Sequence, residues 1–106
     1  MKKINIIKSN EEFNNIIKTG KVLKNQYYVI YYINEIKDKY RIGISVPKKI
    51  GKAVIRNKIK RQLKNIIRNN KEKIQNLNYI IITRSNILNL NYHEKEKELI
   101  KLLSNL

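Results

Sequence analysis

The residues best able to do chemistry lie in one basic segment, 41–71, "RIGISVPKKIGKAVIRNKIKRQLKNIIRNNK". The segment holds eleven Lys or Arg and no Asp or Glu, in a chain of 106 residues whose net charge is +16. Cations at this density attract polyanions and displace counterions from phosphates, and nucleic acid is the commonest partner of this kind. A solvated basic face is the alternative, but the clustering favours nucleic-acid binding.

Arginine and asparagine add specificity to this charge. Arg56 and Arg61 can each bind two phosphate oxygens or stack on a base, whereas lysine acts as a point charge. Asn57 either hydrogen-bonds a base edge or a 2′-hydroxyl, or is neutral filler. The candidate RNA-binding residues are Lys48, Lys49, Lys52, Arg56, Asn57, Lys58, Lys60, Arg61, Lys64 and Arg68.

Four tyrosines crowd the apolar stretch 21–35. In a strand, alternation places Tyr28 and Tyr32 on one face and Tyr27 and Tyr31 on the other. One pair then packs in the core, and the other forms an open platform on which unpaired bases stack. The alternatives are that both pairs are core or that one is plain sheet surface. The pattern does not decide which face is open.

The usual catalytic constellations are missing. His93 is the only histidine and there is no cysteine. The acidic residues occur in short polar stretches without metal-ligand spacing, and Glu94 and Glu98 are typical of surface pairing with nearby lysines on a helix. The two glycines of "GISVPKKIG" lack the spacing of a phosphate-binding loop. We expect no catalytic residue and no metal site in this chain.

Length and composition predict one domain over residues 1–106. Hydrophobic residues make up 42% of the chain, enough for a folded core. Without cysteine there is no disulfide framework, which fits a reducing compartment. No apolar run approaches the ~18 residues of a transmembrane helix. We expect a cytoplasmic protein with no membrane partner.

The elements that must position these residues can be predicted in order. Residues 9–20 predict a helix with Ser9 as N-cap, Glu12 at the capping-box position and Gly20 as the stop. Residues 21–35 predict one or two strands, 39–46 another strand ended by Pro47, and 78–85 a strand buried on both faces. Residues 91–106 predict a final helix capped by Asn91.

A long amphipathic helix is predicted at about 53–69. Its apolar and cationic residues recur at three- and four-residue steps, so each set shares a face. The apolar set is Ile55, Ile59, Leu63, Ile66 and Ile67, and the adjoining cationic ridge is Arg56, Lys60, Lys64 and Arg68.

The predicted order is αβββαβα, or αββαβα if 21–35 is a single strand. This order indicates an α/β (α+β) two-layer sandwich with a central, mostly antiparallel sheet of about four strands. The segment from Arg41 to Thr83 reads as strand, helix and strand, which is a crossover between two parallel strands.

The stretch "GISVPKKIGKAVIRNKIKRQLK", 43–64, resembles the motif of the protein subunit of bacterial ribonuclease P. That motif runs Arg-Asn-Arg, one residue, Lys-Arg, two residues, Arg. Phe13, Gly20, the tyrosine-rich strand, "YIIIT" and the closing helix also fall in family order, so the resemblance covers nearly the whole chain. The matching positions are Arg56, Asn57, Lys58, Lys60, Arg61 and Lys64.

The resemblance implies a cofactor-like subunit of an endoribonuclease. In this family a large catalytic RNA, with magnesium, hydrolyses precursor tRNA to release the 5′ leader. The implied partners are ribonuclease P RNA and precursor tRNA, with magnesium bound by the RNA, no cofactor bound by the protein alone and no protein partner required. The family fold also implies a left-handed crossover, against the usual right-handed preference.

Two binding surfaces follow from the same resemblance. The helix from Arg56 to Arg68 would face the catalytic RNA, and a cleft between the first helix and the sheet would hold the single-stranded leader. Tyr28 is a further candidate for the cleft, because the open face of its strand is not fixed. The residues carried over to the cleft are Phe13, Ile17, Tyr31, Ser45 and Lys49.

Three other functions remain open. A ribosomal or general basic RNA-binding protein shares the charge but needs no leader cleft. A self-sufficient nuclease is disfavoured by the missing acid, His and Cys constellation. A membrane-active basic protein needs a detachable amphipathic segment, and the buried-looking strand "YIIIT" indicates a folded domain instead.

Overall fold

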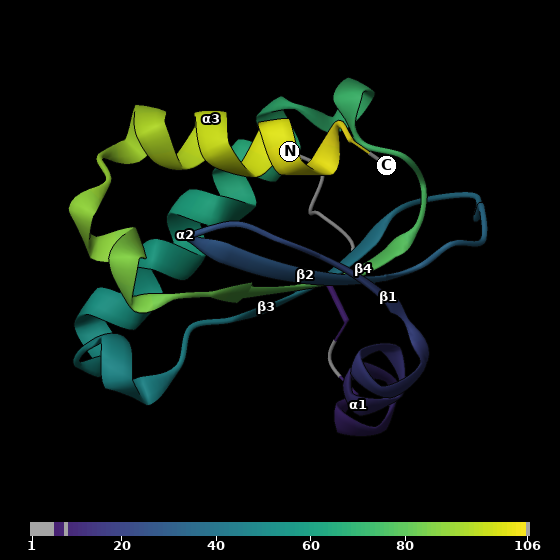
Figure 1. Ribbon diagram of the computed structural model, residues 1–106, viewed down its shortest axis with the longest axis horizontal. Coiled ribbons are helices and arrows are strands. Elements are labelled where there is room, and N and C mark those ends of the chain that lie inside the picture. Colours follow the sequence, from purple (N-terminus) through teal and green to yellow (C-terminus); the bar gives the residue numbers. More distant parts are fainter. Residues whose placement is uncertain (1–5, 8, 106) are drawn as a thin grey trace.

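The computed structural model describes residues 6–7 and 9–105, which form a twisted sheet with helices on both of its faces (Figure 1). Short 3-10 turns at Lys48–Ile50, Lys71–Lys73 and Ser85–Asn89 join the main elements. The main elements are α1 (Asn10–Thr19), β1 (Lys21–Lys24), β2 (Tyr28–Ile33), β3 (Arg41–Ser45), α2 (Ala53–Asn69), β4 (Asn78–Thr83) and α3 (Tyr92–Leu103). The predicted order αβββαβα is confirmed, and the predicted end of the last helix at Leu106 lies outside the described residues.

The sheet has the strand order β1-β2-β4-β3. β1 pairs antiparallel with β2, β2 antiparallel with β4, and β3 parallel with β4. The predicted mostly antiparallel sheet and the crossover from β3 through α2 to β4 are therefore confirmed. β4 lies between β2 and β3, so it is an inner strand of the sheet. This position agrees with the sequence pattern, which predicts that β4 is buried on both faces.

The two faces of the sheet carry different helices, with α2 and α3 on one side and α1 alone on the other (Figure 1). The larger core lies under α2 and α3 and includes Leu63, Tyr79 and Leu99. A smaller cluster around Ile16 and Ile80 lies under α1. The two-layer sandwich thus describes the sheet with α2 and α3, and α1 adds a short third layer that leaves part of its face uncovered.

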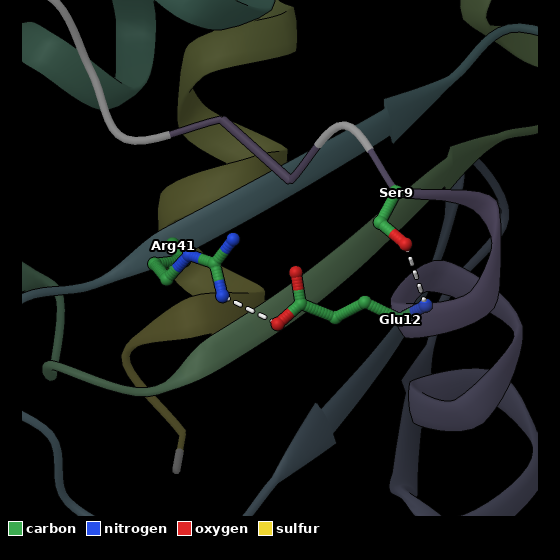
Figure 2. A network of polar contacts seen from close by, with 3 residues as sticks. All are labelled: Ser9, Glu12 and Arg41. Atoms are coloured by element: carbon green, nitrogen blue, oxygen red, sulfur yellow. Dashed lines mark hydrogen bonds and ion pairs between the residues drawn. The ribbon is translucent and has the colours of Figure 1, made fainter.

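Helix α1 begins as predicted at Ser9, whose Oγ accepts a hydrogen bond of 3.3 Å from the backbone N–H of Glu12. The Glu12 side chain does not complete a capping box. Its carboxylate pairs instead with the guanidinium of Arg41 on β3 (Figure 2). This ion pair and the Ser9 cap together hold the first turn of α1 over the edge of the sheet.

Gly20 ends α1 as predicted, but not through a left-handed backbone, since its φ is −78°. A Cβ at this position would lie 2.5 Å from the backbone oxygen of Ile16 and 2.7 Å from that of Tyr32. Glycine is therefore required by the close approach of the helix end to β2.

Helix α2 has the predicted bounds, and its apolar face is buried with one exception. Ile59, Leu63, Ile66 and Ile67 are at most 3% exposed, whereas Ile55 is 41% exposed. The prediction that Ile55 belongs to the buried face is wrong, because the first turn of α2 extends past the edge of the core.

Candidate nucleic-acid interface

The outer face of α2 presents the predicted cations in two rows. Arg56, Lys60, Lys64 and Arg68 are half-buried, which is where a ridge beside an apolar face must lie. The second row is exposed and consists of the cations Lys58 and Arg61 with the neutral amide Asn57.

The arginines at the two ends of the ridge also have structural contacts. Arg56 Nε donates to the Gly51 carbonyl at 3.2 Å, which ties the first turn of α2 to the loop before it. Arg68 Nη1 donates to Asn65 Oδ1 at 3.3 Å. Burial raises the pKa of the Tyr40 phenol, and the positive charge of Arg68 partly offsets this rise. Contacts of this kind hold a guanidinium near one orientation.

The loop that leads into α2 adds further positive charge. Lys48, Lys49 and Lys52 are all exposed, and Lys52 is the N-cap residue without a side-chain cap bond. The first turn of α2 carries no acidic residue. Among the described residues, the ion pairs Glu35–Lys37 and Glu12–Arg41 do not involve these three lysines. The loop therefore keeps its charge for an external anion.

A second surface lies on the face of the sheet that carries α1. A hollow of about 590 Å³ occupies the part of this face that α1 leaves uncovered. Tyr31 and Val29 of β2 and Ile82 of β4 form part of its floor. The full lining is Val22, Lys24, Val29, Tyr31, Pro47, Lys49, Ile82, Thr83, Arg84, Ser85 and Asn86.

Three exposed cations border this hollow from three separate segments: Lys24 at the end of β1, Lys49 before α2, and Arg84 after β4. Arg84 is held against the turn between β1 and β2, because its Nη1 donates to the carbonyl of Asn25 at 3.2 Å. An apolar floor with one tyrosine and a cationic rim can take bases on the floor and phosphates at the rim.

Two of the six predicted cleft residues, Tyr31 and Lys49, line this hollow. Phe13 and Ile17 belong instead to the cluster packed under α1, where the Phe13 ring would lie 3.0 Å from a Cβ added at Gly43. Ser45 is half-buried at the end of β3. Phe13 and Ile17 therefore support α1, and none of these three residues lines the hollow.

The prediction that Tyr28 lines the cleft is wrong. Its side chain is 0% exposed in the core under α2 and α3, and its hydroxyl donates to the Lys95 carbonyl at 3.0 Å. Burial, with a smaller contribution from Glu98, raises its pKa, so the phenol stays neutral. Tyr28 is therefore an internal tie between β2 and α3.

The pairing of Tyr27 with Tyr31 on one face is also wrong. Tyr27 precedes β2 and packs toward the larger core, together with Tyr32. The side chain of Asn25 accepts hydrogen bonds from the backbone N–H groups of both Tyr27 and Tyr28, so the chain turns there and strand alternation begins only at Tyr28.

Sequence reasoning missed Lys24, Arg84 and Val29. In the hairpin register Lys24 pairs with Val29, so a known turn at Asn25 would have placed both on one face. Arg84 becomes part of the rim only because β4 lies next to β2, which no local pattern shows.

His93, the only histidine of the sequence, is exposed as expected. Within residues 6–7 and 9–105, no group of three or more His, Cys, Asp or Glu side chains is placed to hold a metal ion. In the same part of the chain, none of the helices is both long enough and apolar enough to span a bilayer.

Comparison with known proteins agrees with this geometry. The model of the Ribonuclease P protein family matches residues 1–106. The chain belongs to this family. The ribonuclease P protein component of Streptococcus pyogenes serotype M5 (strain Manfredo) is 46% identical over 67 residues, which is 63% of this chain and 56% of that protein. The match thus spans little more than half the length of that relative.

Solved structures of ribonuclease P proteins superimpose over most of the chain. The Staphylococcus aureus protein matches with a TM-score of 0.88 and 35% identity, covering 97% of this chain and 95% of that one. The Thermotoga maritima protein matches with a TM-score of 0.87 and 31% identity, covering 96% and 97%. A Staphylococcus aureus mutant described as defective in mRNA degradation activity has a TM-score of 0.87, with 35% identity over 94% and 86% of the chains. The ribonuclease P protein fold is thus shared.

Proposed function

We propose that this chain is the protein component of a ribonuclease P ribonucleoprotein that matures the 5′ ends of tRNA. The observation that carries the proposal is the presence of two distinct basic surfaces. One is the outer face of α2, and the other is the hollow on the opposite side of the sheet. The family membership supports this proposal, in which we assign the catalytic RNA to α2 and the precursor tRNA leader to the hollow.

The α2 surface suits a folded RNA. Its rows of cations run along a helix of 17 residues, and such a row can follow a phosphate backbone over several nucleotides. The paired donors of Arg56 and Arg61 add directional contacts to phosphate oxygens that lysine cannot make.

The hollow suits a single strand. Tyr31 offers a ring for stacking, and Val29 and Ile82 offer apolar contact that does not depend on the base. In this proposal the rim cations Lys24, Lys49 and Arg84 bind phosphates of the same strand. The 3-10 turn Lys48–Ile50 joins the hollow to the start of α2, so one strand could pass from the leader site toward the RNA core.

In this proposal the catalytic RNA supplies the chemistry and binds the magnesium ions. Several acidic side chains of the protein are engaged in structural contacts. Glu12 pairs with Arg41, Glu94 caps α3, and Glu96 accepts from Asn70 at 2.9 Å. These contacts leave them poorly placed to act as general bases, and we assign no catalytic residue to this chain. We also infer a cytoplasmic location, where tRNA is processed.

The test is reconstitution with the cognate ribonuclease P RNA. The purified protein should lower the magnesium concentration that the RNA needs to cleave precursor tRNA, and it should leave precursor tRNA intact when the RNA is absent. A general RNA-binding protein would bind the RNA without changing its magnesium requirement. Cleavage by the RNA-free protein that persists through fractionation would instead support a protein nuclease.

A further inference from the structure

Lys95 of α3 is a buried cation that does not belong to the basic surface of α2. Only 7% of the residue is exposed, and it lies where α3 packs against α2. Its ammonium donates to Gln62 Oε1 of α2 at 2.7 Å. A neutral amide oxygen leaves the positive charge uncompensated.

The charged groups around Lys95 do not supply a counter-charge. In the described part of the chain no carboxylate lies within ion-pair distance of its Nζ. Two acids of α3 bond to other groups: Glu94 accepts from the backbone N–H of Asn91, and Glu96 accepts from Asn70.

The charge that does reach Lys95 has the same sign. Burial lowers the pKa of Lys95, and Lys58, an exposed cation of α2, lowers it further. A buried cation that feels the charge of a second cation is unfavourable in a protein that carries a net charge of +16. An external anion bound near Lys95 would compensate for this repulsion.

We propose that Lys95, Gln62 and Lys58 form a phosphate-binding site where α3 packs against α2. The ligand is a backbone phosphate of the RNA that α2 binds, so the site extends the RNA contact from α2 onto α3. The amide of Gln62 orients the ammonium, and a phosphate oxygen accepts its remaining N–H donors. This inference rests on the proposed function, since it takes the α2 partner to be RNA.

The first experiment measures the affinity for ribonuclease P RNA as a function of salt. Methionine at position 95 keeps most of the apolar stem and removes the charge, so Lys95→Met should weaken binding about tenfold, the loss of one charge-assisted hydrogen bond. The slope of log affinity against log salt should become shallower by about 0.7–0.9. The matched control is Lys97→Met, which removes an exposed charge from the same helix and should change affinity less than about twofold.

A second variant tests the same site if Lys95→Met unfolds. Gln62→Glu places a carboxylate where the amide oxygen now accepts from Lys95, so it supplies the missing counter-charge within the protein. It should raise the melting temperature of the free protein and weaken RNA binding, and the gain in melting temperature should vanish when Lys95→Met is added.

The outcomes separate this inference from the proposed function. If the unaltered protein binds the RNA without salt dependence, the proposed function fails. If the unaltered protein binds with a steep slope but Lys95→Met and Lys97→Met behave alike, the phosphate site is wrong. Unchanged RNA affinity in Gln62→Glu would overturn it equally.

Discussion

Tyr28 and Tyr31 lie on the same strand, three residues apart, and face opposite sides of the sheet. Tyr28 is sealed under α3, and Tyr31 contributes to the open hollow on the other face. The odd spacing produces this division, because side chains alternate along a strand. One strand thus provides an internal tie to the helical layer and a tyrosine ring that lines the hollow.

Gly20 gives a prediction about the fold. Gly20→Ala should lower the free energy of unfolding by about 3 kcal/mol, because the added methyl meets two backbone oxygens that cannot move aside. Gly51→Ala is the matched control. There the methyl meets only the side chain of the exposed Ile55 at 3.2–3.4 Å, and a change of less than about 1 kcal/mol is expected. Urea unfolding of both variants is the measurement, and equal costs would refute the close-approach explanation.

The buried tyrosines predict a loss of stability in alkali. Burial raises the pKa of Tyr28 and Tyr79 above the ordinary value of 10.0, so above that pH the unfolded chain releases protons that the folded protein keeps. Stability is therefore fully present below pH 10 and should fall by up to about 1.4 kcal/mol per pH unit for each residue above it. Burial lowers the pKa of Lys95 below its ordinary value of 10.5. Its contribution to stability therefore rises with pH, but only below pH 10.5, where the unfolded chain still holds the proton.

Denaturant unfolding between pH 10.5 and 12 measures this effect. Tyr79→Phe should flatten the pH dependence, after correction for its lost hydrogen bond to the Gln75 carbonyl. If tyrosinate absorbance shows all seven tyrosines ionising near pH 10 in the folded protein, the burial of Tyr28 and Tyr79 is wrong.

The exposed cations of α2 predict a steep salt dependence of RNA binding. Each phosphate contact contributes about −0.7 to −0.9 to the slope of log affinity against log salt. Arg61→Ala should make the slope shallower by that amount, and Arg61→Ala with Lys64→Ala by about twice as much. Lys101→Ala removes an exposed charge from α3 and serves as the control. An identical slope in the double variant and the control would show that α2 is only a solvated face.

Local patterns predicted α2 and its charged face well. The apolar period of three and four residues continues from Ile59 to Ile67, and this period predicts the helix over 53–69. Periodicity cannot show where the core ends, so the pattern places the exposed Ile55 on the buried face. Burial at a helix end depends on the neighbouring layer.

The hollow on the α1 face is harder to predict, because it is assembled from segments that are distant in the sequence. Lys24, Lys49 and Arg84 meet only because the strand order is β1-β2-β4-β3. The sequence does not show which face of the tyrosine-rich strand is open. The packing of α3 covers the face that carries Tyr28, so Tyr28 lies in the core. The handedness of the crossover stays a prediction from the family resemblance.

The most direct test of the two-surface account is the binding of precursor and mature tRNA to holoenzymes reconstituted with Tyr31→Ala. Base–aromatic stacking is worth about 1–3 kcal/mol, so precursor tRNA should bind roughly fivefold to a hundredfold more weakly. Mature tRNA, which has no leader, should bind unchanged. Tyr92→Ala, which removes an exposed tyrosine from α3, is the control, and melting curves establish that both variants are folded. A selective loss for precursor tRNA in Tyr31→Ala alone is the result we expect, and an equal loss for both tRNAs, or none for either, would contradict the account.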